Sequence, residues 1–363
     1  MIRCAEAVLD GHPDKFCDII SDRMIQLAMD QDPAVCAQIE VGVWSDQIWL
    51  SGAVVSCKEL ELDTEQLIHE IGREIGYTQD NHIDVERYKV SDHVCRIQAD
   101  PAEYAGYYGD QCIAIGWAGY DRKTHFLPPE QFLVHCFRTA LNDAVCPGSG
   151  APLSGEGPDG KLLVRLRENF GGREWCLEHV LVTLQQKPET LLDDLEERVL
   201  QLFEEVYEKV MKKDRRWILP FDQVETLVNP NGPFLEGGSN SDNGQTGRKL
   251  VMDYYGPRIP IGGGALSGKS LQHIDRLAAY ASRQLAVEAV QGDAKDCLVQ
   301  LNYAPGIAEP LDIFISAPVA GKVSKLSLTR ASILERYKNI PVRELGCGKH
   351  FFDLDFPWNT GNT

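Results

Sequence analysis

The fold and chemistry of this chain centre on a glycine-rich stretch, Gly237-Gly238-Ser239-Asn240-Ser241-Asp242-Asn243-Gly244-Gln245-Thr246-Gly247-Arg248-Lys249, continued by Gly262-Gly263-Gly264-Ala265-Leu266-Ser267-Gly268-Lys269-Ser270 and Asp275-Arg276. Because glycine has no Cβ, its backbone takes unusual conformations and can lie close to a ligand. Exposed amides together with Lys and Arg hold polyphosphates. Asp242 and Asp275 are the hard oxygen ligands that Mg²⁺ prefers. The stretch therefore predicts a site for ATP phosphates with one or two Mg²⁺ ions.

The segment Gly263–Ser270 also satisfies the P-loop pattern G-x-x-x-x-G-K-[ST]. A P-loop requires a buried strand before the pattern and a helix after it. Pro257 and Pro260 precede the pattern here, and proline cannot donate to a central strand. We expect the match to be accidental. A P-loop phosphotransferase, which would release ADP, stays the rival hypothesis.

Composition narrows the function classes. The 363 residues are 43% apolar and 25% charged, as in a soluble globular protein. No run of 18 apolar residues predicts a membrane helix, and the N-terminus lacks a signal peptide's apolar core. The net charge of −18 argues against a nucleic-acid or membrane-surface binder. Eleven cysteines without a C-x-x-C pair indicate reduced thiols and a cytoplasmic location.

Six cations lie close to glycine- or proline-rich segments, and we expect them to gather around a triphosphate: Lys15, Lys161, Arg248, Lys249, Lys269 and Arg276. The alternative for each is a solvated surface charge. His12, Asp14 and Lys15 stand at a predicted helix start, where free N–H groups attract anions. We therefore expect His12 on the phosphate side of the site.

Apolar spacing predicts helices at 14–30, 63–75, 131–145, 192–210, 274–285 and 328–337. It predicts strands at 35–43, 47–56, 112–118, 162–166, 176–184, 298–303 and 311–315. The segment 98–109 has neither period and is expected to be a mobile, lid-like loop. Strand pairs followed by a helix recur at 35–76, 162–210 and 298–337, which indicates a repeated α+β layer.

An ordered set of motifs is more specific than any one loop. The set comprises Gly11-His12-Pro13-Asp14-Lys15, Gly109-Asp110-Gln111, Pro158-Asp159-Gly160-Lys161, Asn229-Pro230-Asn231-Gly232-Pro233-Phe234, Thr246-Gly247-Arg248-Lys249, Ser267-Gly268-Lys269, Asp275-Arg276 and Ala308-Glu309-Pro310. From about Glu6 to Pro357 the chain resembles S-adenosylmethionine synthetases (methionine adenosyltransferases). The resemblance implies three similar α+β subdomains in a pseudo-threefold arrangement, with sheets buried at a dimer interface. The implied subdomains are N-terminal (1–10 and 121–229), central (11–98 and 230–277) and C-terminal (107–120 and 278–363), with a gate loop at 98–109.

The same resemblance implies the reaction. Methionine sulfur attacks C5′ of ATP, and the tripolyphosphate leaves and is cleaved to pyrophosphate and phosphate. The implied catalytic residues are His12, Lys161, Arg248 and Lys269, and the implied ATP-binding residues add Lys15, Asp159, Phe234 and Lys249. Methionine would be bound by Gln98, Asp110 and Asp242, Mg²⁺ (two ions) by Asp14 and Asp275, and K⁺ by Glu40. The implied assembly is a homodimer or dimer of dimers with shared sites.

Three positions depart from the family pattern. Ala53 stands where a glutamate binds the methionine ammonium group, and its loss removes a contact of roughly 1.5–3 kcal/mol. His273 replaces a phosphate-side lysine, and Pro305 replaces an isoleucine near the methionine side chain; the gate is also short. Two alternatives therefore stay open: an adenosyltransferase with another sulfur acceptor, and a catalytically weak, nucleotide-binding regulatory subunit.

Overall fold

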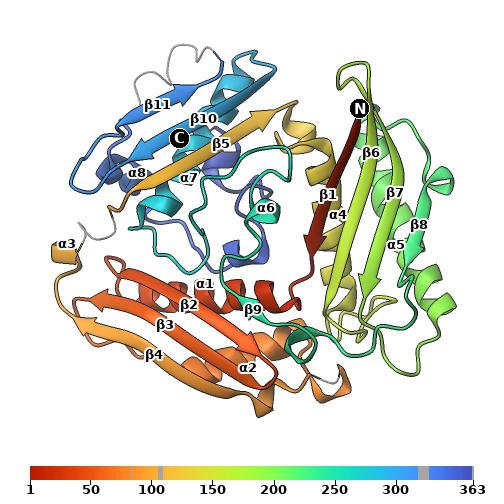
Figure 1. Cartoon of the computed structure of the whole chain (residues 1–363), viewed down its shortest axis with the longest axis horizontal. Coiled ribbons are helices and arrows are strands. Elements are labelled where there is room, and N and C mark those ends of the chain that lie inside the picture. The colour runs from red at the N-terminus through yellow and green to blue at the C-terminus, as the bar shows by residue number, and fades with distance from the viewer. Residues whose placement is uncertain (82, 105–108, 318–326, 362–363) are drawn as a thin grey trace.

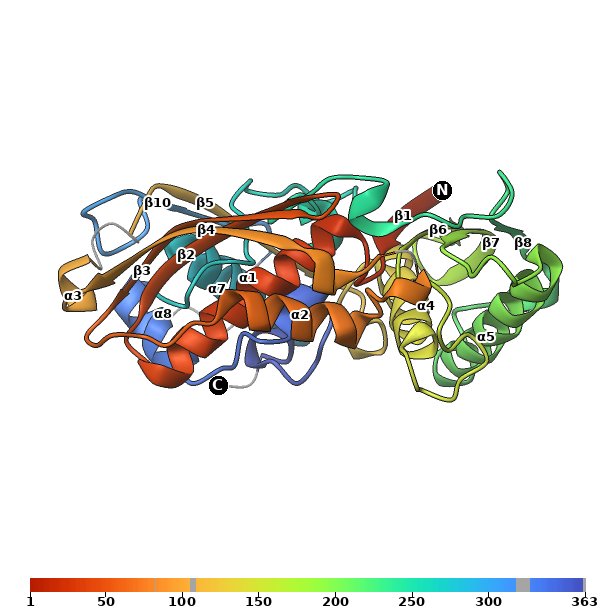
Figure 2. The same ribbon diagram turned by 90° about the horizontal axis from the view of Figure 1, so that it is seen from below.

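The computed structural model describes residues 1–81, 83–104, 109–317 and 327–361. Within these residues the chain has a mixed α+β architecture with three separate sheets arranged around a central region (Figure 1). The strands lie towards one broad face of the molecule, and most helices lie towards the opposite face (Figure 2). One large apolar core fills the space between these layers.

The first sheet has the strand order β4-β3-β2-β9. Its strands are β2 (Cys36–Trp44), β3 (Gln47–Ser56), β4 (Lys89–Gln98) and β9 (Gly244–Gln245). β2 and β3 form the predicted antiparallel hairpin, and the turn residue Ser45 has a φ of 53°. Helix α1 (Pro13–Gln31) packs on β2, and α2 (Thr64–Ile75) packs on α1. The N-cap of α2 is Asp63, whose side chain accepts a hydrogen bond from the Gln66 amide.

The second sheet has the order β1-β6-β7-β8. Its strands are β1 (Ile2–Val8), β6 (Gly160–Asn169), β7 (Glu174–Leu184) and β8 (Glu225–Val228). Helix α4 (Pro129–Val145) packs on β1 and β6, and α5 (Leu192–Lys213) packs on α4. The first and second sheets are connected in the same way. In each, a hairpin is followed by an outer helix, and the next strand runs parallel to the second strand of the hairpin.

The third sheet has the order β11-β10-β5. Its strands are β5 (Cys112–Gly119), β10 (Asp296–Tyr303) and β11 (Asp312–Ile315). Helix α7 (Ile274–Gln291) packs on β5 and β10, and α8 (Arg330–Tyr337) packs on α7. Each sheet is thus covered by one inner helix, which carries an outer helix in turn. The proposed subdomain boundaries stay a prediction.

The structure corrects the expectation of an unstructured gate and confirms the expectation that the P-loop match is accidental. Part of the segment expected to be an unstructured gate is ordered, because Gln98 ends β4 and Pro101–Tyr104 forms the short helix α3; residues 105–108 lie outside the described residues. The P-loop pattern at Gly263–Ser270 follows no strand and forms only an isolated bridge between Lys269 and Gln38, so the P-loop reading is excluded. Among the described helices, none is both long and apolar enough to cross a membrane.

Candidate functional site

The two glycine-rich segments lie end to end along the free edge of β2. The Thr246 amide donates to Val41 O at 3.0 Å, next to the β9 pairing at Gly42 and Val43. Further along β2, Ile39 donates to Gly268 O at 2.7 Å. A Cβ added to Gly247 would lie 2.7 Å from the Ala265 Cβ, so the segments also touch one another. This arrangement brings Arg248, Lys249 and Lys269 to one edge of one sheet.

Helix α1 holds the same segments from the other side. Asp14, Asp18 and Asp22 are spaced one helical turn apart and are all buried. Their carboxylates accept hydrogen bonds from the backbone amides of Gln245 (2.9 Å), Gly247 (2.8 Å) and Gly268 (2.9 Å), respectively. The sequence reasoning did not single out Asp18 or Asp22. The signal was present as three acids at i, i+4 and i+8 on a helix whose other residues include a run of apolar side chains.

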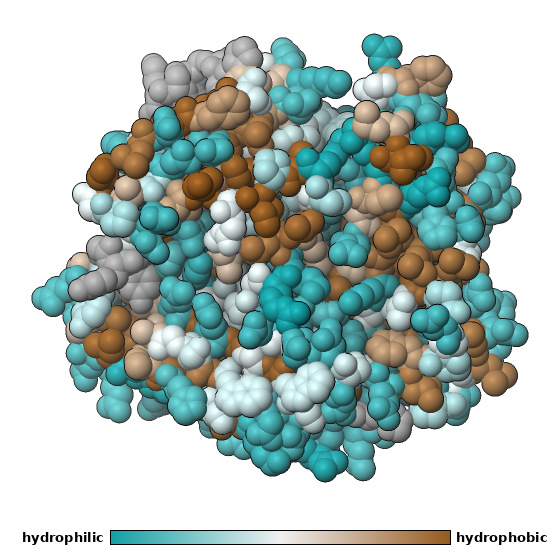
Figure 3. Space-filling model, in the orientation of Figure 1, coloured by the Kyte–Doolittle hydropathy of each residue, from teal (hydrophilic) through white to brown (hydrophobic). Residues whose placement is uncertain are grey.

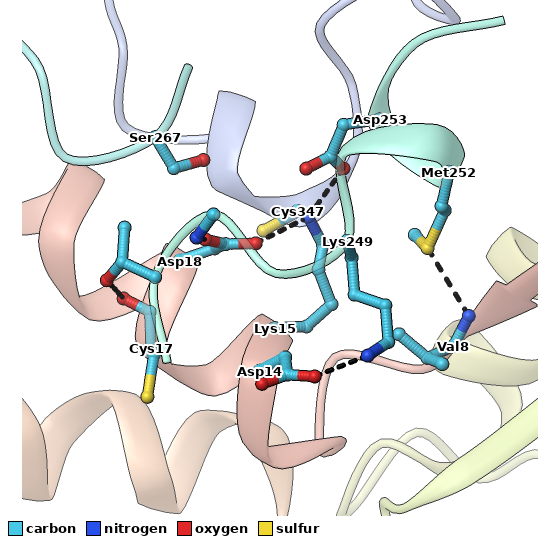
Figure 4. A network of polar contacts seen from close by, with 12 residues as sticks. Val8, Asp14, Lys15, Cys17, Asp18, Lys249, Met252, Asp253, Ser267 and Cys347 are labelled. Carbon is cyan, nitrogen blue, oxygen red and sulfur yellow. Dashed lines mark hydrogen bonds and ion pairs between the residues drawn. The ribbon is translucent and has the colours of Figure 1, made fainter. Parts of the chain in front are cut away.

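The start of α1 gathers one group of predicted site residues. His12 is the N-cap, and its Nδ1 accepts from the Asp14 amide at 3.2 Å. Lys249 Nζ donates to Asp14 Oδ2 (Figure 4), and Arg248 Nε lies 3.5 Å from Asp14 Oδ1. Burial, and next the charge of Lys249, lowers the pKa of His12 to about 4. The ring is therefore neutral at pH 7, and with Nδ1 accepting, its proton resides on Nε2.

Two further candidates lie beside this group. Lys161 stands exposed at the start of β6, and its charge also lowers the pKa of His12. Asp159 accepts from the Gly238 amide at 2.7 Å, and burial raises its pKa to about 6. The charge of Asp242 acts on both His12 and Asp159, which places it in the same neighbourhood.

The start of α7 repeats the arrangement at the start of α1. His273 is the N-cap, and its Nδ1 accepts from the Asp275 amide at 3.2 Å. Lys269 Nζ donates to Asp275 Oδ2 at 2.6 Å. Burial, and next the charge of Lys269, lowers the pKa of His273 to about 4. The replacement residue His273 thus gives the site a second buried N-cap histidine with a lysine–aspartate pair beside it.

Two of the six expected cations face inward. Lys15 is fully buried, and its Nζ contacts Asp18 Oδ2 at 2.9 Å and Asp253 Oδ1 at 2.6 Å (Figure 4). Burial opposes its charge, but these two carboxylates raise the pKa of Lys15. Arg276 is fully buried within α7 and pairs with Asp22, which corrects the expectation that it faces a triphosphate. The prediction that Lys15 binds phosphate stays a prediction.

The candidates for methionine and K⁺ lie in separate surroundings within one chain. Gln98 is exposed at the end of β4, whereas the charge of Asp110 acts on His273, and Asp242 belongs to the His12 group. Glu40 lines a pocket of about 560 Å³ on the first sheet, together with Ala53. Phe234, expected at the adenine, is half-buried, and its carbonyl accepts from the Gln186 amide. Pro305, one of the departures from the family pattern, is exposed in the β10–β11 loop.

Comparisons with known proteins identify the family of the chain. The profile of the S-adenosylmethionine synthetase N-terminal domain matches residues 1–98, and that of the C-terminal domain matches residues 236–344. The S-adenosylmethionine synthase of Rhodospirillum centenum is 33% identical over 347 residues, covering 93% of this chain and 86% of that protein. That of Maricaulis maris is 34% identical over 339 residues, covering 90% and 83%.

The chain belongs to the S-adenosylmethionine synthetase family. The two matched ranges contain the three structural parts of the site: α1, the hairpin β2–β3, and both glycine-rich segments. Lys161 and Asp159 lie between those ranges, and the contact of Asp159 with Gly238 joins them to the family's C-terminal segment.

Proposed function

We propose that the protein is an ATP-dependent methionine adenosyltransferase. The observation that carries the proposal is the gathering of Arg248, Lys249 and Lys269 on the β2 edge, beside the buried N-cap His12. A leaving tripolyphosphate carries several negative charges, and preorganised cations stabilise such charge as it develops. The names of the relatives, S-adenosylmethionine synthase, support the same reaction.

In the proposed reaction a lone pair of the methionine sulfur forms a bond to C5′ of ATP. The C5′–O5′ bond breaks, and its electron pair leaves on the tripolyphosphate, which is then hydrolysed to pyrophosphate and phosphate. The Nε2–H of neutral His12 would donate a hydrogen bond to the departing O5′, because its Nδ1 is occupied by the Asp14 amide. Lys161, Arg248 and Lys269 would stabilise the leaving charge, with Lys15, Asp159, Phe234 and Lys249 completing the ATP site.

The described residues could hold Mg²⁺ through single carboxylates that share the ion with the phosphates of ATP. No group of three or more His, Cys, Asp or Glu side chains suited to a metal occurs among them. Mg²⁺ is, however, commonly held by one or two carboxylates together with substrate phosphates. Asp14 and Asp275 each offer one carboxylate beside a lysine, so we propose them as ligands for two Mg²⁺ ions, which would neutralise phosphate charge. Glu40, an exposed carboxylate facing the 560 Å³ pocket, is the proposed K⁺ ligand.

Methionine is the proposed acceptor, bound by Gln98, Asp110 and Asp242. The charge of Asp110 acts on His273 and that of Asp242 on His12, and we propose that a second copy completes the methionine site. No observation favours a different acceptor or a regulatory subunit. Ala53 and Pro305 nevertheless lack two contacts to methionine that the family resemblance implies at those positions. A cytoplasmic location stays a prediction.

We propose a homodimer, or a dimer of dimers, joined through the strand faces. The space-filling view shows hydrophobic residues gathered on the face that carries the strands (Figure 3). Large hydrophobic residues are exposed on strands of these sheets: Trp49 of β3, Ile113 of β5 and Phe314 of β11 are each about half exposed. Large exposed apolar patches mark protein interfaces. A pseudo-threefold relation of the subdomains is proposed on the shared pattern of sheet, inner helix and outer helix.

The test is an assay with ATP, methionine, Mg²⁺ and K⁺, with all products identified. We expect S-adenosylmethionine with one pyrophosphate and one phosphate per turnover. Lys269→Met should lower kcat by about 10²–10³-fold, the usual effect of removing one preorganised group that stabilises transition-state charge. Lys295→Met, at an exposed lysine outside the proposed site, is the control. Formation of ADP, or of no sulfonium product, would reject the proposal.

A further inference from the structure

The buried ion pair of Asp22 and Arg276 holds the backbone at Gly268 and Lys269. Asp22 Oδ1 accepts from the Gly268 amide at 2.9 Å, and Arg276 Nη1 donates to Lys269 O at 2.6 Å. Asp22 and Arg276 are joined to each other by two further bonds of 2.8 and 2.9 Å, and both are fully buried. The amide that enters Gly268 and the carbonyl that leaves Lys269 are therefore fixed by a single bidentate pair, whose planar fork has little freedom to turn.

The opposite side of the segment is fixed by β2. The Gly268 carbonyl accepts from Ile39, and the Ser270 amide donates to Ala37 O at 2.8 Å. Gly268 has a φ of 80°, and a Cβ there would lie 2.1 Å from Ile39 O, so the close approach requires glycine. With the backbone held on both sides, the direction of the Lys269 side chain is set before any ligand arrives.

Hydrogen bonds connect Arg276 to the C-terminal segment. Arg276 Nε donates to the Tyr280 hydroxyl at 3.0 Å, and that hydroxyl lies 2.9 Å from His350 Nδ1. The Trp358 ring stacks on Tyr280 with 3.8 Å between ring centres, and its Nε1 donates to His350 O at 2.6 Å. Since all these groups are buried, no solvent loosens the connection.

We propose that Asp22 and Arg276 are positioning residues for Lys269, and that Tyr280 and His350 link this position to the packing of the C-terminal segment. The proposal rests on the proposed function, because it assigns Lys269 to the leaving phosphates. Asp22 and Arg276 are assigned no ligand contact, because their side chains bond to each other, to the Gly268–Lys269 backbone and to Tyr280. Their effect is exerted through the Gly268–Lys269 backbone, and a shift of about 1 Å at a group that orients a reactant can cost about 100-fold in rate.

Helix α7 offers a matched control. Arg283 lies seven residues beyond Arg276, about two turns along the same helix, and is equally buried. Its guanidinium donates to backbone carbonyls, among them His125 O at 2.7 Å, and to Asn359 Oδ1 at 3.0 Å. None of these partners belongs to the glycine-rich segments. Arg276→Lys and Arg283→Lys thus remove the same planar fork from similar surroundings. Both variants lose a bond near the C-terminal segment, because Asn359 donates to His350 O at 3.1 Å, but only Arg276→Lys removes a direct bond to Lys269 O.

The experiment compares kinetics and lysine reactivity in the two variants of the full chain, at a temperature where both are folded. Arg276→Lys should lower kcat by about 10- to 100-fold relative to Arg283→Lys, with the KM for methionine changed less than about twofold. Trace labelling with acetic anhydride, read by mass spectrometry, should raise the Lys269-to-Lys249 labelling ratio several-fold in Arg276→Lys alone. Tyr280→Phe, which keeps the ring packing, should change both readouts in the same direction by a smaller factor.

Equal losses of kcat in the two arginine variants would overturn the proposal, and so would an unchanged labelling ratio in Arg276→Lys. If the unaltered protein formed no S-adenosylmethionine, the proposed function would fail while the labelling ratio still decided the positioning role. If Arg276→Lys did not fold, Tyr280→Phe would decide by the same comparison with Arg283→Lys.

Discussion

At the scale of single residues, the sequence predicted which cations lie close to the glycine-rich segments but not which way they face. Lys161, Arg248, Lys249 and Lys269 reach the site, as expected of charges close to glycine-rich segments. Lys15 directly follows Asp14 in the first turn of α1, yet the two side chains have different partners. The reason is the helix itself, because side chains one position apart point about 100° away from each other. The ammonium group of Lys15 therefore contacts Asp18 and Asp253. No local sequence pattern indicates that these residues lie close to Lys15.

This geometry separates two roles for Lys15. Lys15→Met should lower the free energy of unfolding by about 3–5 kcal/mol, because it leaves Asp18 and Asp253 buried without their cation. Lys161→Met should change it by less than about 0.5 kcal/mol, since Lys161 is exposed, while abolishing most activity. Urea unfolding followed by circular dichroism gives both values. A Lys15→Met protein with unchanged stability and lost activity would instead favour direct phosphate binding by Lys15.

At the scale of elements, helices and hairpins were predictable and the added strands were not. Helix α5 and the pair β6–β7 follow clear periods of 3.6 and 2. β4 is mostly exposed and mixes polar with apolar residues, so no alternation marked it. β9 is only two residues long and exists because β2 offers a free edge. β1 alternates in burial over its first six residues, but Ile2 is exposed and Arg3 is half-buried, so the apolar residues of its sequence do not follow that alternation.

The exposed face of these strands carries a prediction about assembly. Trp49 is 45% exposed between the buried Ile48 and Leu50, so it points away from the helices that cover the sheet. If this face is the dimer interface, Trp49→Glu should weaken association at least about 30-fold, the effect of losing an aromatic hot spot of about 2 kcal/mol. Phe170→Glu, at a more exposed aromatic in the β6–β7 turn, should have no effect. Sedimentation at several concentrations tests this, and a single-chain mass for the unaltered protein would contradict it.

At the scale of the whole molecule, the site depends on contacts between distant parts of the chain. The family resemblance could indicate that residues 12–14, 161, 248–249 and 269–275 act together. It could not give the reason, which is that Asp14, Asp18 and Asp22 hold two segments more than 220 positions away. The chain's ending is also tied to the centre, since Phe352 stacks on His135 with 5.1 Å between ring centres and His350 bonds to Tyr280. Such contacts have no local sequence signal.

The docking of this C-terminal segment around buried histidines predicts a pH dependence of stability. Burial, and next the charge of Arg138, lowers the pKa of His135 to about 3. The unfolded chain binds a proton there below about pH 6.5, whereas the folded protein does not until about pH 3. Stability therefore rises with pH in this range and is lost as the pH falls from 6.5 towards 3. At pH 5.5 the loss from His135 should be about 1.4 kcal/mol.

Asp159 has the opposite effect on the pH dependence. Burial raises its pKa to about 6, so the folded protein binds this proton more readily than the unfolded chain, and stability gains as the pH falls. The experiment must therefore isolate the contribution of His135. We expect the drop in unfolding free energy between pH 7.5 and 5.5 to be smaller by about 1.4 kcal/mol in His135→Gln than in the unaltered protein. Urea unfolding at the two pH values measures both proteins. Equal drops in the His135→Gln variant and the unaltered protein would mean that the folded protein protonates His135 as readily as the unfolded chain does, and that burial beside Phe352 does not keep this ring neutral.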